Sequence, residues 1–245
     1  MRLFMSLYCR DENKQAISRA ARIAVAAASV LAAGGVQAQA GGSVSLASEY
    51  SARGVSLSNG RPAAQLSLSY DAAQGWYAGA FAAPGLTQAG RSGVTKLVAY
   101  GGYAHRLPSG LSWEAGASST SFSHQSVYNY REVFLGLASD RLSGRIYLAP
   151  AYYGYGGRVA YAELNGFYPL RERIKLIAHA GVLHGLSGLA AMYRDRVDMR
   201  LAVGFDAGQC NVQLAWLGTS SIGSGPYRGG GRAPRAIALS ASYPF

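Results

Sequence analysis

The stretch R-A-I-A-L-S-A-S-Y-P-F, Arg235–Phe245, alternates larger apolar side chains with alanine and serine. Successive residues of a β-strand point to opposite faces, so the larger side chains share one face of a strand. That face carries no charge and consists of Ile237, Leu239, Ala241, Tyr243 and Phe245. In a protein surrounded by water, such a strand would pair with other chains and aggregate. The stretch therefore predicts a strand that faces lipid and closes a barrel.

The first 40 residues have the parts of a secretory signal peptide. Basic residues precede an apolar run over Ile23–Ala33, which is too short to span a bilayer as a helix. Ala38-Gln39-Ala40 is a small-x-small cleavage signal. We therefore expect a signal peptide over 1–40 and one barrel domain over 41–245. An N-terminal membrane anchor is the alternative.

Charge and cysteine content narrow the classes of partner. The chain has a net charge of +11, and the first 40 residues hold five of its 23 basic and two of its 12 acidic residues, which leaves +8 afterwards. An exported chain seldom meets nucleic acid, so an anionic solute or an anionic lipid surface is the expected partner. Cys9 lies in the predicted signal and Cys210 is then alone, which excludes an internal disulfide and a paired-thiolate metal site.

The remaining composition favours an outer-membrane barrel. No segment after the signal has 18 consecutive apolar residues, charged residues make up 14%, and the chain has 32 glycines and 17 tyrosines. Export, low charge and many tyrosines are typical of bacterial outer-membrane β-barrels. We expect this localisation, with outer-membrane lipid around the chain.

The chain after the signal divides into about twelve segments, each near the ten residues that a tilted strand needs to cross a bilayer. The clearest is Arg194–Asp206, where five apolar residues from Val197 to Phe205 alternate with charged or small ones. In Gly75–Ala82 the aromatic residues are divided between both faces, so its lipid side is not assigned. The other predicted strands are Ser43–Arg53, Ala63–Asp71, Thr95–Arg106, Leu111–Phe122, Tyr130–Ala138, Leu142–Tyr152, Arg158–Pro169, Ile174–Leu183, Cys210–Leu217 and Arg235–Phe245. The predicted fold is all-β, a single antiparallel transmembrane barrel in an up-and-down meander.

The connections differ in length. Short ones, rich in Asp, Gly, Pro and Ser, are typical of tight turns: Asp71–Gly75, Arg106–Gly110, Ser139–Ser143, Leu170–Arg173 and Asp206–Gln209. Mostly longer ones are Gly54–Gly60, Ala83–Gly93, Ser123–Asn129, His184–Tyr193 and Gly218–Pro234, with Tyr153–Gly157 as a short exception. Short periplasmic turns and longer outer loops are the asymmetry of outer-membrane barrels.

Several short motifs resemble those of the TorF-type porins, the Gcw_chp family. The run S-E-Y-S-A-R-G-V-S at Ser48–Ser56 resembles the family's opening S-D-Y-x-x-R-G-x-S, and Gly75–Gly79 resembles its G-x-Y-x-G strand. Tyr161–Asn165 and Tyr168–Leu170 resemble its Y-x-E-L-N and Y-P-L elements. The resemblance implies a proteobacterial outer-membrane barrel of porin type and brings no catalytic residues.

Charged residues on the non-lipid faces are the candidate pore lining. Lys or Arg facing lipid near mid-bilayer costs about 2–4 kcal/mol, so these residues should point inward or lie at the interfaces. They either line a water-filled path that selects solutes by charge and size, or pair to fill a closed barrel. The cluster of arginines on Arg194–Asp206 favours anions. The predicted lining residues are Glu49, Arg53, Lys96, Glu114, Glu132, Arg145, Glu163, Lys175, Arg194, Arg196, Asp198 and Arg200.

Aromatic residues near strand ends or on lipid faces predict interfacial girdles. The expected members are Tyr50, Tyr70, Tyr103, Tyr152, Tyr243 and Trp216. A stacking platform for sugars, built from Tyr152, Tyr153 and Tyr155, is the alternative for part of this set. The terminal Phe245 resembles the C-terminal aromatic that outer-membrane barrels present to their assembly machinery.

The sequence offers no catalytic, cofactor or metal motif. The four histidines lack metal-ligand spacing, no G-x-S-x-G elbow is present, and Gly229–Gly231 lacks the Lys and Ser or Thr of a phosphate loop. The predicted function is passive passage of small polar, including anionic, solutes without a cofactor. The alternatives are a closed structural or adhesion barrel acting through its outer loops, and a membrane-embedded lipid enzyme.

Overall fold

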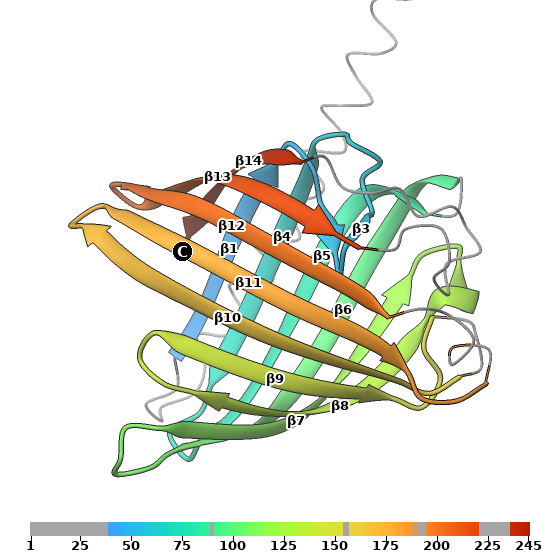
Figure 1. Cartoon of the computed structure of the whole chain (residues 1–245), viewed down its shortest axis with the longest axis horizontal. Helices are drawn as coiled ribbons and strands as arrows, with labels where there is room; N and C mark the ends of the chain where they lie inside the picture. The colour runs from blue at the N-terminus through green and yellow to red at the C-terminus, as the bar shows by residue number, and fades with distance from the viewer. Residues whose placement is uncertain (1–38, 89–90, 154–156, 189, 191–194, 221–235) are drawn as a thin grey trace, which may run out of the picture.

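The computed structural model describes residues 39–88, 91–153, 157–188, 190, 195–220 and 236–245. Within them, twelve antiparallel strands close into one barrel (Figure 1). Their bounds are β1 Gln39–Ala47, β4 Ala63–Asp71, β5 Trp76–Gln88, β6 Arg91–Arg106, β7 Ser112–Phe122, β8 Tyr130–Ala138, β9 Leu142–Ala149, β10 Val159–Arg171, β11 Ile174–Gly185, β12 Arg196–Ala207, β13 Cys210–Thr219 and β14 Ile237–Pro244. A 3₁₀ turn, Ser126–Tyr128, precedes β8. None of the helical segments in the described part of the chain is long and apolar enough to cross a membrane.

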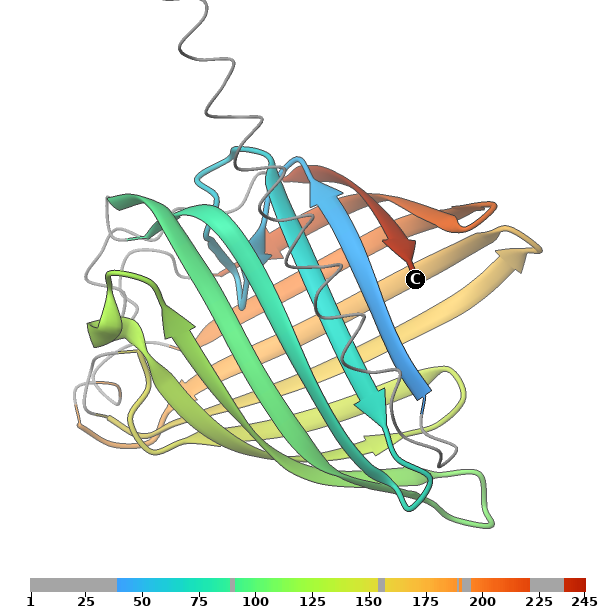
Figure 2. The same cartoon turned by 180° about the vertical axis from the view of Figure 1, so that it is seen from behind.

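The last strand closes the barrel against the first. β14 pairs antiparallel with β1, with Leu46 opposite Ala241, and β1 pairs on its other side with β4. Gly42 and Phe245 exchange two backbone hydrogen bonds of 2.9 and 3.0 Å. Figure 2 shows β1 and β14 side by side at this seam. The predicted all-β antiparallel meander is confirmed.

The period-two pattern separates an apolar outside from a polar inside. On β12, Met199, Leu201, Val203 and Phe205 are 45–49% exposed, whereas Arg196, Asp198 and Ala202 on the opposite face are buried. On β14, Ile237 and Leu239 also face outward. Because the barrel is closed, no unpaired backbone edge faces lipid, which is the requirement for a membrane-spanning sheet. The apolar side chains form the belt that faces the lipid.

All five predicted short turns lie at one end of the barrel, as Figure 1 shows at the ends of β10–β11 and β12–β13. The predicted loop Ala83–Gly93 is wrong, because β5 continues to Gln88 and β6 already begins at Arg91. The pairing is irregular between Ala83 and Leu86. Ala83, Leu86 and Val94 in these strand extensions are buried. Pro84 explains the irregular pairing, because proline has no N–H to donate to the neighbouring strand.

The first predicted strand, Ser43–Arg53, is also too long. β1 ends at Ala47, and the chain then forms a small separate hairpin of β2, Ser51–Ala52, and β3, Val55–Ser56. Its turn residues Arg53 and Gly54 have φ of +47° and +75°, which suits a two-residue turn of the type that joins tight hairpins. The predicted outer loop Gly54–Gly60 therefore belongs to a segment that folds into the barrel.

The predicted signal peptide stays a prediction. Residues 1–38 lie outside the described residues, and Gln39 and Ala40 belong to β1, where they pair with Asp71 and Tyr70.

Candidate functional site

The β2–β3 hairpin is attached to the barrel wall by a buried ion pair. Arg53 at its tip donates two hydrogen bonds of 2.7 and 2.8 Å to the carboxylate of Glu132 on β8. Their side chains are only 13% and 4% exposed. Burial lowers the pKa of Arg53, but neighbouring tyrosines and the Glu132 carboxylate raise the pKa by more, so it lies well above its usual range. The guanidinium therefore stays charged inside the barrel.

Tyrosine rings surround that guanidinium. Its carbon lies 4.3 Å from the ring centre of Tyr161 and 5.1 Å from that of Tyr147. Tyr152 and Tyr130 contribute two further rings at 5.5 and 6.0 Å. Electron-rich ring faces attract a cation, so the pocket stabilises Arg53 beyond its ion pair.

Two residues predicted for the lipid girdle lie inside the barrel instead. Tyr152 is buried with Tyr153 and Phe122 in an apolar cluster on the loop side. Tyr50 precedes the hairpin and packs against Phe81 with ring centres 5.7 Å apart. Both were assigned to the girdle because they are near strand ends in the sequence. The hairpin folds inward, however, and gives each of them a partner in the interior.

The other predicted girdle residues lie at the outer surface or in contact with it. Tyr70, Tyr243 and Trp216 are exposed, and Tyr103 contacts the exposed Trp76 with ring centres 5.2 Å apart. Of the residues proposed for a sugar platform, Tyr152 and Tyr153 are buried and Tyr155 is not among the described residues. Both described rings border the interior cavity described below, so a sugar platform that includes them stays a prediction.

Lys96 on β6 is a buried cation without a carboxylate partner among the described residues. Its Nζ donates to the Tyr50 hydroxyl at 3.1 Å and lies 5.5 and 5.9 Å from the ring centres of Tyr50 and Phe81. Only 8% of the residue is exposed. Its charge is therefore balanced by a hydroxyl and two ring faces.

A second network lies inside the barrel. Arg145 on β9 donates to Glu114 on β7 from Nε at 2.5 Å and from a terminal nitrogen at 3.2 Å. Glu114 also accepts a hydrogen bond of 2.7 Å from the hydroxyl of Tyr77. The Tyr147 hydroxyl donates to Glu163 at 3.2 Å. These bonds link β5, β7, β9 and β10 across the interior.

The third network lies on β10, β11 and β12. His179 is 2.9 Å from Asp198 and 2.7 Å from the amide oxygen of Asn165, and the Tyr161 hydroxyl donates to Asp198 at 3.3 Å. The side chain of His179 thus points into the barrel. Within the described ranges, no three His, Cys, Asp or Glu residues are arranged to hold a metal ion.

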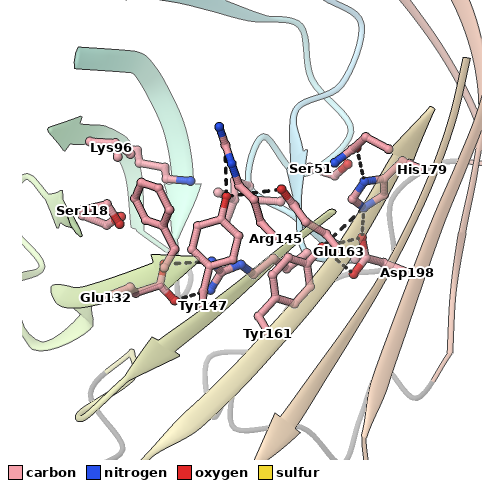
Figure 3. Close-up of a pocket in the computed structure, with 18 of the residues that line it drawn as sticks. Ser51, Lys96, Ser118, Glu132, Arg145, Tyr147, Tyr161, Glu163, His179 and Asp198 are labelled. Carbon is pink, nitrogen blue, oxygen red and sulfur yellow. Dashed lines mark hydrogen bonds and ion pairs between the residues drawn. The ribbon is translucent and has the colours of Figure 1, made fainter. Parts of the chain in front are cut away.

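These networks border a cavity of about 530 Å³. Figure 3 shows Lys96 on one side of it and His179 with Asp198 on the other, with Arg145, Tyr147 and Glu163 between them. Seven predicted lining residues border the cavity: Arg53, Lys96, Glu132, Arg145, Glu163, Asp198 and Arg200. The hairpin contributes part of its wall, because Ser51, Ala52 and Gly54 also border it.

The remaining predicted lining residues lie elsewhere. Glu114 points inward and is bonded to Arg145, and Lys175 is 3.2 Å from Asp206 at the turn end. Glu49 and Arg196 are buried, Glu49 just after the end of β1 and Arg196 at the start of β12. Arg194 is outside the described residues.

Sequence reasoning missed the inward tyrosines. Tyr130, Tyr147 and Tyr161 each border the cavity. Each also stands two residues from a predicted inward charge, in the pairs Tyr130–Glu132, Arg145–Tyr147 and Tyr161–Glu163. Because alternate residues of a strand share a face, the same period that placed the charges would have placed these rings.

A family model for the Gcw_chp family, described as a bacterial protein of unknown function, matches residues 32–228. The chain belongs to this family. The match spans all three interior networks and the inward hairpin. A search of curated proteins found no match.

Solved porins share the fold of this Gcw_chp member. A KdgM porin in complex with disordered oligogalacturonate is 13% identical, with a TM-score of 0.53 over 84% of this chain and 99% of the porin. A NanC porin is 11% identical, with a TM-score of 0.53 over 84% of this chain and 98% of the porin. At these identities the likeness shows the fold alone. The shared barrel fold confirms the predicted localisation in the bacterial outer membrane.

Proposed function

We propose that this barrel is a porin-like channel for passive passage of small polar solutes across the outer membrane. One observation carries the proposal: a closed barrel with an apolar outer belt encloses a polar cavity of about 530 Å³. Outer-membrane porins of known structure share the fold, and the resemblance to TorF-type porins belongs to this proposal. The cavity residues are its proposed pore lining.

The proposed preference is for anions. Among the described residues, Lys96 and Arg200 border the cavity without a carboxylate partner, and Arg200 donates at 2.6 Å to the neutral amide of Gln213. The carboxylates of Glu163 and Asp198 instead accept hydrogen bonds from tyrosine hydroxyls. Spare cationic donors on a pore wall favour the passage of negative solutes.

Single-channel conductance of the refolded protein in planar bilayers tests this function. We expect stable conductance steps in KCl, and a reversal potential under a salt gradient that indicates preference for chloride. The substitution Arg200→Glu should move that preference toward potassium. The matched control is Arg106→Glu, an equal charge change on the exposed last residue of β6, which is paired with Asp140.

A closed barrel acting through its outer loops is the competing proposal. It is favoured by the inward hairpin and by the buried cluster of Phe122, Tyr152 and Tyr153 on the loop side. The absence of conductance steps over many verified insertions would support this closed barrel and overturn the channel. Hydrolysis of phospholipid by the same preparation would point instead to a membrane-embedded enzyme.

A further inference from the structure

We infer that Lys96 is the anchor of a binding subsite for a small hydroxylated monocarboxylate inside the lumen. This inference rests on the proposed function, because the solute that passes through the cavity would be the ligand. Lys96 borders the cavity, and Figure 3 shows its side chain extending toward the cavity from β6.

The ammonium of Lys96 has unused binding capacity. An ammonium carries three N–H donors and accepts nothing. Among the described residues, its one hydrogen bond goes to the Tyr50 hydroxyl. A buried cation with spare donors is costly without a counter-ion, so an anion entering the cavity would find a desolvated charge that a hydroxyl and two ring faces stabilise but no carboxylate neutralises.

Two other cations of the cavity are already neutralised. Arg53 is bound in bidentate fashion by Glu132, and Arg145 is bound by Glu114. Lys96 therefore offers one net positive charge on its side of the cavity. One such charge suits a singly charged carboxylate better than a phosphate dianion, whose second charge would have no local partner.

The wall beside Lys96 indicates the rest of the ligand. Ser118 and Thr120 on β7 and Tyr100 on β6 border the same cavity, and their hydroxyls both donate and accept hydrogen bonds. Val98 and Phe122 add apolar surface next to them. Hydroxyls interspersed with apolar surface suit a solute that carries several hydroxyl groups on a carbon chain or ring.

Calorimetry on the full barrel refolded in detergent micelles tests the subsite, with D-gluconate as the probe and neutral D-glucose as its comparison. We expect gluconate to bind and glucose to bind at least tenfold more weakly. Lys96→Met, which keeps the apolar stem, should weaken gluconate binding at least tenfold, and Lys96→Arg should restore most of it because the charge returns. Arg106→Met, which also removes one positive charge, should change gluconate affinity less than twofold.

The outcomes separate the subsite from the channel. Equal binding of gluconate and glucose, or unchanged gluconate affinity in Lys96→Met, would overturn the subsite. If the wild-type barrel conducts in KCl and binds no gluconate, the subsite fails and the channel stands. If gluconate binds in a manner that requires Lys96 while no conductance is seen, the subsite stands and the channel fails. Heat-modifiable migration on gels verifies that each variant is folded.

Discussion

At the scale of single residues, two arginine–carboxylate pairs differ in how much they contribute to stability, because one is buried and the other is exposed. Arg53 and Glu132 are almost fully buried, whereas the side chains of Arg106 and Asp140 are 64% and 79% exposed. Removing one partner of a buried pair leaves an uncompensated charge away from water. Removing one partner of an exposed pair returns the other to solvent, where screening leaves little to lose.

We predict that Glu132→Ala lowers the free energy of unfolding by about 3–5 kcal/mol. Asp140→Ala, the matched control in the exposed pair, should lower it by less than about 1 kcal/mol. Urea titration of both variants in micelles, followed by heat-modifiable migration, measures the difference. Equal losses in the two variants would contradict a stabilising role for the Arg53–Glu132 pair.

Gly54 is the second residue whose location decides its effect. Its φ is +75°, and a Cβ there would lie 2.5 Å from Thr219 Oγ1 and 3.0 Å from Asp198 Cβ. Gly208 has a similar φ of +66°, but a Cβ there would meet nothing within 4 Å. The two glycines thus share the backbone cost of a left-handed conformation and differ in steric crowding.

We predict that Gly54→Ala destabilises the barrel more than Gly208→Ala, by an additional 1–3 kcal/mol or so, which is the range for overpacked sites. The same urea titration gives both values. A loss at Gly54 no larger than the loss at Gly208 would show that the hairpin moves aside without cost.

At the scale of elements, the β2–β3 hairpin is a segment outside the barrel wall that borders the interior cavity. β1 and β4 pair directly up to Ala47 opposite Ala63, so the barrel wall does not need the hairpin between them. The Ser48–Ser56 motif, which the sequence places on the first strand and loop, forms this hairpin and its approach. The motif therefore lies inside the barrel rather than in its wall.

We predict that replacing residues 51–57 with a short Gly-Ser linker raises single-channel conductance at least twofold. The physical reason is that the hairpin borders the cavity and its removal widens the path for ions. Replacing Pro108 and Ser109 in a turn by two glycines is the control and should leave conductance unchanged. Unchanged conductance in the linker variant would place the narrowest point elsewhere.

At the scale of the whole molecule, closure depends on the β1–β14 seam. Phe245 contributes backbone hydrogen bonds to Gly42, while its side chain is 55% exposed. The backbone contribution would survive a change of side chain. The exposed aromatic ring is thus available for recognition during assembly, as the resemblance to other outer-membrane barrels suggests.

We predict that Phe245→Ser lowers the amount of barrel inserted into membranes in cells and leaves conductance per inserted molecule unchanged. Tyr70→Ser, which removes another exposed aromatic ring, is the control and should insert at the normal level. Quantitative gels of outer-membrane fractions, together with single-channel recordings, measure both quantities. Altered conductance at normal insertion would refute a role for Phe245 in assembly.

The sequence alone determined the barrel: about twelve strands, the apolar outer face, the turns at one end and the closure of Arg235–Phe245 against the first strand. These features follow from a period of two and from turn chemistry, which are local properties of the chain. The same period indicated that Lys96, Glu132, Arg145 and Asp198 point inward, and could have included the tyrosines two residues away from such charges.

Only the tertiary structure decided which inward residues meet. Arg53 and Glu132 are 79 residues apart, and their contact requires both a closed barrel and a hairpin that folds into it. No local pattern indicates that Tyr50 and Arg53 leave the wall, because their partners lie on β6 and β8. Contacts across a lumen depend on barrel registration and on the path of an inserted segment, and these are properties of the assembled sheet.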